Sequence, residues 1–289
     1  MYKTDILKGE KYSLKTANFL LSNQKLTSID YISDLHLEYH FSFVERKFDK
    51  YIESILPEYS NYEFLVIAGD ISDYNSYSKT FLKKISKFYK HVIVILGNHD
   101  LYLPTKTQQR KYYNSHNRVI DLIYDTSTPR NVHFVGQWSN NLKVLKSNSN
   151  EMIAFVGGFL GYPTNSKSDE YFYKNVSYDS DKIIGIEISP QEVYNFEKNV
   201  LQSLLKAITT TKEIDKTVLI THVPPIITQS HVELDSTACY YAPLNKALLP
   251  KYNIFGHTHE VVSFEKEGKK FYSNGVVFTK EKIKSFYLV

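Results

Sequence analysis

The sequence predicts an α/β fold with a parallel sheet, and three observations support this prediction. Residues 64–68 (FLVIA) and 91–96 (HVIVIL) are continuous apolar runs of strand length, as expected for strands buried on both faces. A segment with apolar residues at helical spacing, 77–89, lies between them. Hydrophobic residues make up 42% of the 289-residue chain and aromatic residues 15%, which is enough for a large buried core.

The first half of the chain extends this pattern to a βαβαβ unit. Residues 28–32 predict a short strand, and the apolar spacing of residues 43–56 predicts a helix that ends before a proline. The strand at 64–68, the helix at 77–89 and the strand at 91–96 complete the unit. Parallel sheets bind ligands beyond the carboxyl ends of their strands, so we expect a site to follow these three strands.

The second half contains further strands and one long helix. Residues 189–210 begin with Ser-Pro, a favourable helix start, and continue with an amphipathic pattern. Residues 158–188 are irregular and rich in tyrosine, and we expect them to form a lid or insert. Residues 1–25 have no clear period and are interpreted as an N-terminal extension of a single domain that spans 1–289. The remaining predicted strands are 132–135, 142–145, 152–156, 217–220, 254–255, a hairpin of 261–264 with 270–272, and 285–289.

Composition and charge narrow the class of protein. The single cysteine, Cys239, excludes an internal disulfide and a multi-thiolate zinc site. The net charge is +4, from 35 basic and 31 acidic residues, a mild bias that permits a polyanionic partner without demanding one. No apolar run reaches transmembrane length, and the first fifteen residues lack the apolar core of a signal peptide. We therefore expect a cytoplasmic protein that does not bind membranes.

Histidine, aspartate and asparagine side chains follow five of the predicted strands. Taken singly, each histidine is better explained as a turn residue, Asp70 as a helix N-cap and Asn98 as part of a turn. Together, imidazole and carboxylate ligands suit Zn, Fe, Mn or Ni better than Mg or Ca. They are too many for one four-coordinate ion and enough for two, with Asp70 as the candidate bridge. The set comprises Asp34, His36, Asp70, Asn98, His99, Asp100, His222, His257 and His259.

Five short motifs carry these residues: SDLH, GDISD, GNHD, THVPP and GHTH, which span residues 33–259. In this order the chain resembles the calcineurin-like metallophosphoesterase superfamily. The resemblance implies a four-layer αββα sandwich of two mixed β-sheets flanked by helices. It also implies a binuclear centre with two divalent transition-metal ions, for which we expect Mn²⁺, with Fe, Zn and Ni as alternatives.

The resemblance also implies a role for each residue. One metal would be held by Asp34, His36, Asp70 and His259, and the other by Asp70, Asn98, His222 and His257. A hydroxide bridging the two ions would attack phosphorus. His99 would donate a proton to the leaving group, and Asp100 would orient His99. Asp73 could accept a hydrogen bond from a histidine of the site.

The substrate is less constrained by the sequence than the metal site. The protein serine/threonine phosphatases of this superfamily have arginines where this chain has Leu96 and Tyr74-Asn75, which disfavours a phosphomonoesterase of that type. We therefore expect a phosphodiesterase that acts on a small or nucleotide-like substrate. A DNA or RNA nuclease is the main alternative, but no dense run of Lys and Arg lies near the motifs. A non-enzymatic scaffold is disfavoured because every expected ligand and His99 are present.

Overall fold

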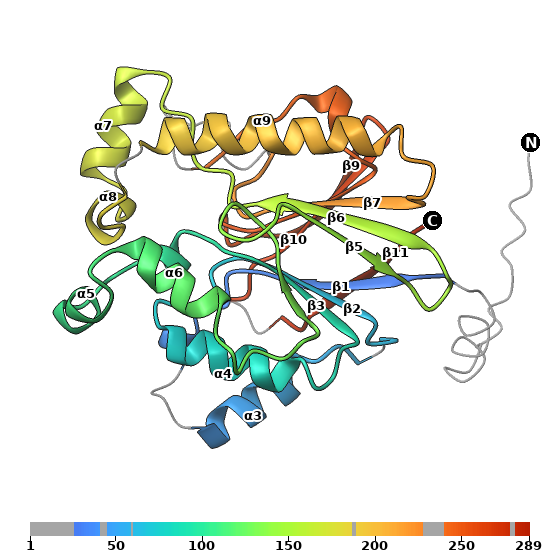
Figure 1. The fold of residues 1–289 in the computed structure, drawn as a ribbon, viewed down its shortest axis with the longest axis horizontal. Coiled ribbons are helices and arrows are strands. Elements are labelled where there is room, and N and C mark those ends of the chain that lie inside the picture. Colours follow the sequence, from blue (N-terminus) through green and yellow to red (C-terminus); the bar gives the residue numbers. More distant parts are fainter. Residues whose placement is uncertain (1–25, 41–44, 59, 187–188, 228–239, 278–280) are drawn as a thin grey trace, which may run out of the picture.

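The computed structural model describes residues 26–40, 45–58, 60–186, 189–227, 240–277 and 281–289. Its strands form two sheets, and helices cover both outer faces (Figure 1). This confirms the predicted αββα sandwich of two mixed sheets. The predicted extension, 1–25, lies outside the described residues.

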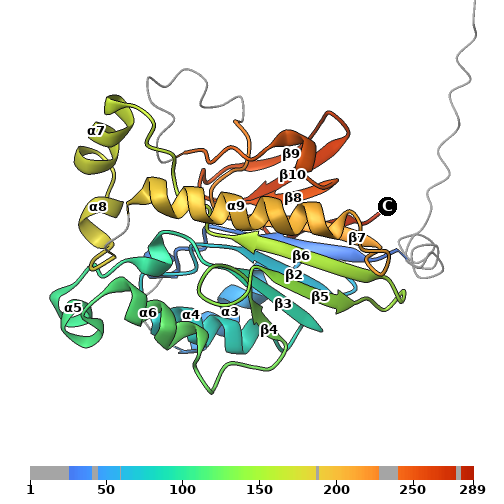
Figure 2. The same cartoon turned by 45° about the horizontal axis from the view of Figure 1, so that its top comes forward.

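The first sheet contains the βαβαβ unit. Strands β1, β2, β3 and β4 are parallel, and β11 pairs antiparallel with β1 at one edge. Helices α3, α4 and α6 pack on its outer face (Figure 2). The strands are β1 (Ser28–Ile32), β2 (Phe64–Ala68), β3 (His91–Ile95), β4 (Val132–Phe134) and β11 (Lys284–Tyr287); the helices are α2 (Leu37–His40), α3 (Glu45–Ile55), α4 (Asn75–Ile85), α5 (Lys106–Tyr112) and α6 (Ser115–Ile123), with a 3₁₀ turn at His99–Leu101.

The second sheet has the strand order β5-β6-β7-β8-β10-β9, in which β6, β7, β8 and β10 are parallel. The long helix α9 lies across its outer face (Figures 1 and 2). The elements are β5 (Leu142–Lys146), β6 (Met152–Gly158), β7 (Lys216–Thr221), β8 (Tyr252–Phe255), β9 (Val261–Lys266), β10 (Lys269–Asn274), α7 (Lys167–Asn175), α8 (Asp179–Lys182) and α9 (Pro190–Ile208), with a 3₁₀ turn at Lys246–Leu248.

Strand β2 shows why the apolar runs of the sequence do not alternate between apolar and polar residues. Phe64, Val66 and Ala68 point into the core between the two sheets, whereas Leu65 and Ile67 point toward the helices. All five are fully buried. Burying a large apolar side chain contributes about 1.5–3 kcal/mol to stability. The side chains on both faces of β2 therefore stabilise the strand at the centre of the sandwich.

The predicted helices are confirmed, with shifts at their ends. The helix predicted at 77–89 is α4, and its last turn tightens after Ile85 through hydrogen bonds from the N–H groups of Lys87 and Phe88 to carbonyls three residues earlier. Helix α9 begins after Ser189, which forms a reciprocal capping box with Glu192.

The segment 158–188 differs from its irregular appearance in the sequence. It contains helices α7 and α8, which lie at one end of the sandwich, at the left of Figure 1. Helix α7 starts with a capping box between Ser166 and Asp169, a local signal that was present in the sequence. Helix α8 has only four residues, too few to show a period.

Candidate metal centre and active site

The candidate ligands lie where strands from both sheets end. Asp34 and His36 follow β1, and Asp70 follows β2. In the second sheet, His222 follows β7, and the GHTH motif follows β8. The five motifs are therefore brought together in space from positions spread over more than two hundred residues.

The backbone at this site is unusual. Ten described non-glycine residues have positive φ, and five of them are candidate metal ligands. Left-handed φ is unfavourable for residues with a Cβ and is retained where the surrounding structure imposes it, often at functional sites. These five residues are Asp34 (52°), His36 (38°), Asp70 (55°), His257 (71°) and His259 (56°).

Two glycines allow the motifs to approach each other closely. A Cβ on Gly97 would lie 2.1 Å from Asp70 Oδ1 and 2.7 Å from a ring carbon of His222. A Cβ on Gly256 would lie 2.6 Å from the carbonyl oxygen of Ala68. Any larger residue at either position would push the motifs apart.

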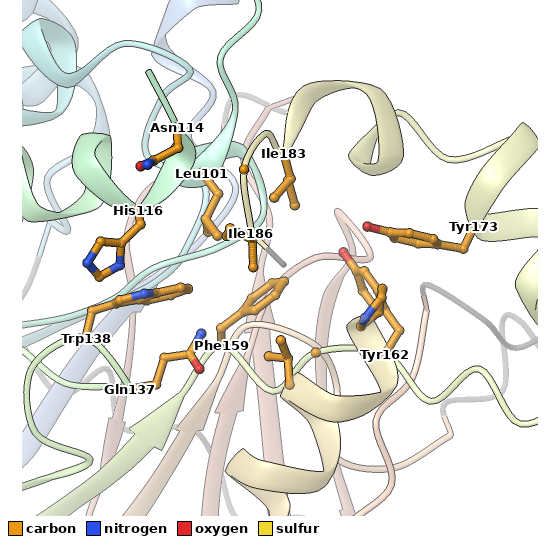
Figure 3. A pocket seen from close by; sticks show the side chains of 14 residues that line it. Leu101, Asn114, His116, Gln137, Trp138, Phe159, Tyr162, Tyr173, Ile183 and Ile186 are labelled. Carbon is orange, nitrogen blue, oxygen red and sulfur yellow. The ribbon is translucent and has the colours of Figure 1, made fainter. Parts of the chain in front are cut away.

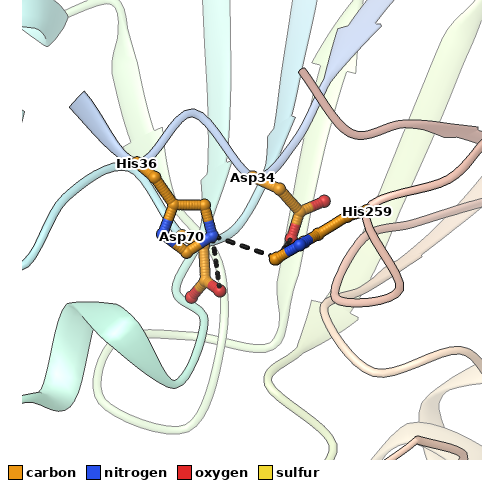
Figure 4. A group of neighbouring side chains, drawn as sticks. All are labelled: Asp34, His36, Asp70 and His259. Carbon is orange, nitrogen blue, oxygen red and sulfur yellow. Dashed lines mark hydrogen bonds and ion pairs between the residues drawn. The ribbon is translucent and has the colours of Figure 1, made fainter. Parts of the chain in front are cut away.

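The first group of donors joins three strand ends (Figure 4). The Nε2 atoms of His36 and His259 lie 3.2 Å apart, and His36 Nε2 is 3.6 Å from Asp70 Oδ2. His259 Nε2 is 3.8 Å from Asp34 Oδ1. One donor atom from each of these four residues lies within 4.8 Å of every other, close enough to share one metal ion.

The second group shares Asp70 with the first. His222 Nε2 lies 3.3 Å from Asp70 Oδ2 and 2.9 Å from Asn98 Oδ1. His257 Nδ1 lies 3.2 Å from the same amide oxygen of Asn98. One donor atom from each of Asp70, His222 and His257 also lies within 4.8 Å of the other two, close enough to share an ion. The structure thus brings together both sets of residues that the sequence assigned to two metals.

The chemistry of these residues fits divalent cations. Asp34 and Asp70 are buried, at 0% and 1% exposure, and each carboxylate faces an imidazole nitrogen: that of His259 for Asp34 and that of His36 for Asp70. Buried carboxylates need a compensating positive charge, and neutral imidazole with carboxylate is a donor set for transition metals. His222 is oriented by its other ring nitrogen, which lies 2.9 Å from the carbonyl oxygen of Ala68.

His99 is held in a separate position beside these groups. Its Nδ1 lies 2.7 Å from Asp73 Oδ1, and its backbone N–H donates to Asp70 Oδ1 at 2.9 Å. Burial disfavours the charged imidazole, but Asp70 and Asp73 outweigh burial and raise the pKa of His99 to about 9. His99 can therefore carry a proton.

The expected role of Asp100 is corrected by the structure. Asp73, not Asp100, makes the carboxylate contact to the His99 ring. Asp100 Oδ2 instead accepts hydrogen bonds from the backbone N–H groups of Asp70, at 3.0 Å, and Gly97, at 2.9 Å. Asp100 thus ties the end of β2 to the end of β3. A side chain that follows His99 directly in a 3₁₀ turn points to a different side of the turn, toward the backbone of the neighbouring strand end.

A cavity of about 320 Å³ opens onto this site. Asp70, Asn98, His99, His257 and His259 line one part of it. The rest is lined by Tyr102, Phe172, Val176, Ser177, Tyr178, Asp179 and Tyr240. Five of these come from segment 158–188, so the predicted insert reaches the site.

Comparison with known proteins now decides the family. The profile of the calcineurin-like phosphoesterase family matches residues 27–261, well over half of the chain. The chain belongs to this family. It is accordingly a phosphoester hydrolase, and the family implies divalent metal ions.

Three proteins that resemble this phosphoesterase have low sequence identity to it. An uncharacterized protein, L509, of Acanthamoeba polyphaga mimivirus is 23% identical over 272 residues, which cover 86% of this chain and 87% of that protein. The crystal structure of a phosphopantetheinyl hydrolase from Mycobacterium tuberculosis matches with a TM-score of 0.59 and 17% identity, covering 85% of this chain and 88% of that one. A 5'-nucleotidase from Candida albicans matches with a TM-score of 0.42 and 13% identity, over 86% of this chain and 46% of that one. At 17% identity, the likeness to the phosphopantetheinyl hydrolase structure shows the fold alone.

Sequence reasoning missed several residues that position the site of the phosphoesterase. Asp179, at the start of α8, accepts hydrogen bonds from Asn98 Nδ2 at 2.9 Å, from Tyr162 Oη at 2.6 Å and from Tyr102 Oη. It lies 81 positions from Asn98, so no local pattern could link them. Glu38 was detectable, because it lies two residues after His36 and its Oε1 is 3.4 Å from His36 Nδ1.

Arg118 braces the loops that carry His99 and Asp73. Its guanidinium is fully buried and donates to the carbonyl oxygens of His99 (2.7 Å), Tyr102 (2.6 Å) and Ser72 (2.7 Å) and to Asn75 Oδ1 (3.0 Å). A buried arginine that binds only carbonyl and amide oxygens acts through backbone geometry, not through substrate charge.

Glu197, on α9, supports the opposite side of the site. Its fully buried carboxylate accepts a hydrogen bond from the Leu160 N–H, in the loop where Phe159 stacks on His222. Burial raises the pKa of Glu197 to about 7, although N–H groups of this loop oppose the shift.

In the part of the chain that the structure describes, we find no helix long and apolar enough to span a membrane. The cytoplasmic location stays a prediction.

Proposed function

We propose that this protein is a divalent-metal-dependent phosphodiesterase that acts on a small or nucleotide-like substrate. One observation supports a diester most directly. Among the described residues that line the site cavity, none is Lys or Arg. A phosphomonoester carries up to two negative charges and a diester one, so a diester needs fewer cationic groups beyond the metals.

The proposed ligands are those that the structure groups. Asp34, His36, Asp70 and His259 would hold one ion, and Asp70, Asn98, His222 and His257 the other. Two bound divalent ions would supply a water nucleophile at neutral pH and neutralise charge on the phosphoryl oxygens. We propose Mn²⁺, with Fe, Zn and Ni as alternatives.

The remaining steps belong to the chain's own residues. Asp73 fixes the His99 ring through Nδ1, which leaves Nε2 as the nitrogen that can give a proton to the leaving oxygen. His99 lines the site cavity, so such a transfer needs no path through the protein interior. Asp100 and Arg118 hold the loop that carries His99 and do not contact the reacting atoms.

The wall of the cavity favours an organic ester group over an extended polyanion. Phe172, Val176, Tyr178 and Tyr240 supply apolar and aromatic surface around the metal ligands. A nuclease would need cationic side chains along a nucleic-acid track, so it remains the second candidate. The fold neighbour named a phosphopantetheinyl hydrolase is compatible with a phosphate ester but does not select the ester.

A substrate panel tests this proposal. The protein, reconstituted with Mn²⁺, is assayed on bis-p-nitrophenyl phosphate, p-nitrophenyl phosphate, cyclic nucleotides and single-stranded DNA, and its metal content is measured. We expect about two ions per chain and the highest kcat/KM on a diester of small size. Dominant turnover of the monoester or of DNA would overturn the proposed substrate class.

A pair of variants tests whether loss of a proposed metal ligand, and not any loss of an aspartate, abolishes activity. Asp70→Asn should abolish turnover and lower the metal content, because Asp70 belongs to both donor groups. Asp181→Asn, on the surface of α8, is the matched control and should keep both. Full activity of Asp70→Asn would contradict the assigned ligand set.

A further inference from the structure

A second cavity, of about 430 Å³, is drawn in Figure 3, and two of its lining rings contact histidines of the candidate metal site. The two cavities have no lining residue in common among those described, and aromatic rings stand between them. The ring of Tyr162 lines the second cavity and packs against His257 with ring centroids 5.5 Å apart. Phe159 also lines it and stacks on His222, with centroids 6.0 Å apart and the planes 23° from parallel.

The lining of this second cavity is aromatic and uncharged. Trp138, Phe159, Tyr162 and Tyr173 present ring surfaces, and no Lys, Arg, Asp or Glu side chain belongs to its described lining. Besides the hydroxyls of the two tyrosines, the polar side chains are two amides and an imidazole, those of Asn114, Gln137 and His116. Figure 3 shows His116, Gln137 and Trp138 gathered on one side, and Tyr162 and Tyr173 on the other.

These groups define the chemistry of a ligand. Flat ring surfaces favour a planar molecule that can stack, and the absence of charged groups in the described lining disfavours an ionic one. Amides can donate and accept at the edge of such a ring at the same time. The volume is within the usual range for a small-molecule site, about 300–1,000 Å³.

We infer that this cavity binds a planar, uncharged heteroaromatic ring of the nucleobase type. The inference goes beyond the proposed hydrolysis, since it concerns binding at a separate cavity that contains no candidate metal ligand. Two sources could supply such a ring: the base of the ester substrate itself, or a free nucleoside that acts as an effector. Both would meet the same stacking surface and amide groups.

The sequence offers a direct reporter for this cavity. Trp138 is the only tryptophan among the 289 residues, so fluorescence excited beyond the tyrosine absorption comes from the cavity wall. The full chain is titrated with adenosine, with and without Mn²⁺, and with ribose as a control. We expect a saturable change in Trp138 emission with adenosine and none with ribose. No saturable change at millimolar adenosine would overturn the inference.

A matched pair of variants locates the binding. Val193→Phe, on α9, places a larger side chain in the cavity and should weaken adenosine binding at least about tenfold, the scale expected for loss of a stacked base. Val200→Phe makes the same change on the same helix outside the lining, and should alter binding less than about twofold. Equal effects would contradict a site in this cavity.

A second variant keeps the test valid if Val193→Phe does not fold. Gln137→Ala changes a partly buried side chain and should weaken adenosine binding about threefold to tenfold, because one hydrogen bond is lost. Unchanged binding in a folded Gln137→Ala protein would argue against contact with the ring edge.

Hydrolysis assays then distinguish the two sources. If the ring belongs to the substrate, adenosine should raise the KM for a nucleotide diester without changing kcat; if it is an effector, adenosine should change kcat. Either result retains the binding site. Because the tryptophan signal does not require turnover, failure of the proposed hydrolysis and failure of this inference give different results.

Discussion

Replacing Asp179 with alanine should weaken metal binding at the proposed site that contains Asn98 and leave the other proposed site unchanged. The Asp179 side chain is 2% exposed and accepts hydrogen bonds from Asn98 Nδ2, Tyr102 Oη and Tyr162 Oη. Asn98 turns its amide nitrogen toward Asp179 and its amide oxygen toward His222. Without the carboxylate, the Tyr102 hydroxyl, 3.1 Å from Asn98 Nδ2, would be the remaining recorded partner of this nitrogen, and it would lose its own hydrogen bond to Asp179.

The expected magnitude follows from these contacts. A hydrogen bond to a charged group contributes about 1.5–3 kcal/mol, so three such bonds set an upper bound of roughly 4–9 kcal/mol. Alanine also removes the desolvation cost of a buried carboxylate, which is several kcal/mol. We therefore expect Asp179→Ala to lower the free energy of unfolding by about 2–4 kcal/mol. Loss of a group that orients a ligand typically weakens metal binding about 10–100-fold.

Calorimetric titration with Mn²⁺ and urea unfolding measure the two effects. Only one of the two Mn²⁺ dissociation constants should change strongly, since Asn98 belongs to one donor group. Asp179→Asn keeps the size of the side chain, and Asp181→Ala, an exposed aspartate of the same helix, is the control. If folded Asp179→Ala binds both ions within twofold of the parent protein, Asp179 does not position Asn98.

Three further changes test other parts of the site. His99→Ala should slow diesters with poor leaving groups by about 10²–10⁴-fold and p-nitrophenyl esters far less; equal losses in steady-state assays would argue against proton donation. The pKa of Glu197 is about 7 in the folded protein and 4.5 ordinarily, so the folded protein holds this proton more tightly than the unfolded chain. The resulting stabilisation, roughly 3 kcal/mol, is fully present below pH 4.5 and is lost as the pH rises through 7. Glu197→Gln should flatten this part of the pH dependence of urea unfolding, and an unchanged slope would refute the assignment. Arg118→Ala should lower the free energy of unfolding by about 3 kcal/mol or more in the same assay, whereas exposed Arg110→Ala should not.

The parts of the fold that could be predicted share one property: their signal is local. Strand β2 is buried on both faces, so five consecutive apolar residues were sufficient to predict it. Helix α9 carries its start signal, Ser189 with Glu192, within four residues. Helix α8 carries no such signal and has only four residues, so segment 158–188 looked irregular.

The grouping of the candidate metal donors could be predicted because short motifs carry them, but their supporting contacts could not. The contact between Asn98 and Asp179 spans 81 positions, and that between Arg118 and Ser72 spans 46. The confusion between Asp73 and Asp100 has the same origin. Asp100 adjoins His99 in the same motif, whereas Asp73 lies 26 positions away in another motif, and only the folded geometry decides which one reaches the ring.

In the GHTH motif, the backbone conformation decides which way the two histidines point. Two histidines separated by one residue would point the same way in a strand, yet His257 and His259 both have left-handed φ and follow the end of β8. His257 faces Asn98, and His259 faces His36 and Asp34. A left-handed backbone conformation costs roughly 1 kcal/mol or more for each non-glycine residue. Five such residues lie around two buried carboxylates, so other interactions at this site must offset their strain. Divalent cations, which the family implies, would supply a compensation that fits this set of carboxylates and imidazoles.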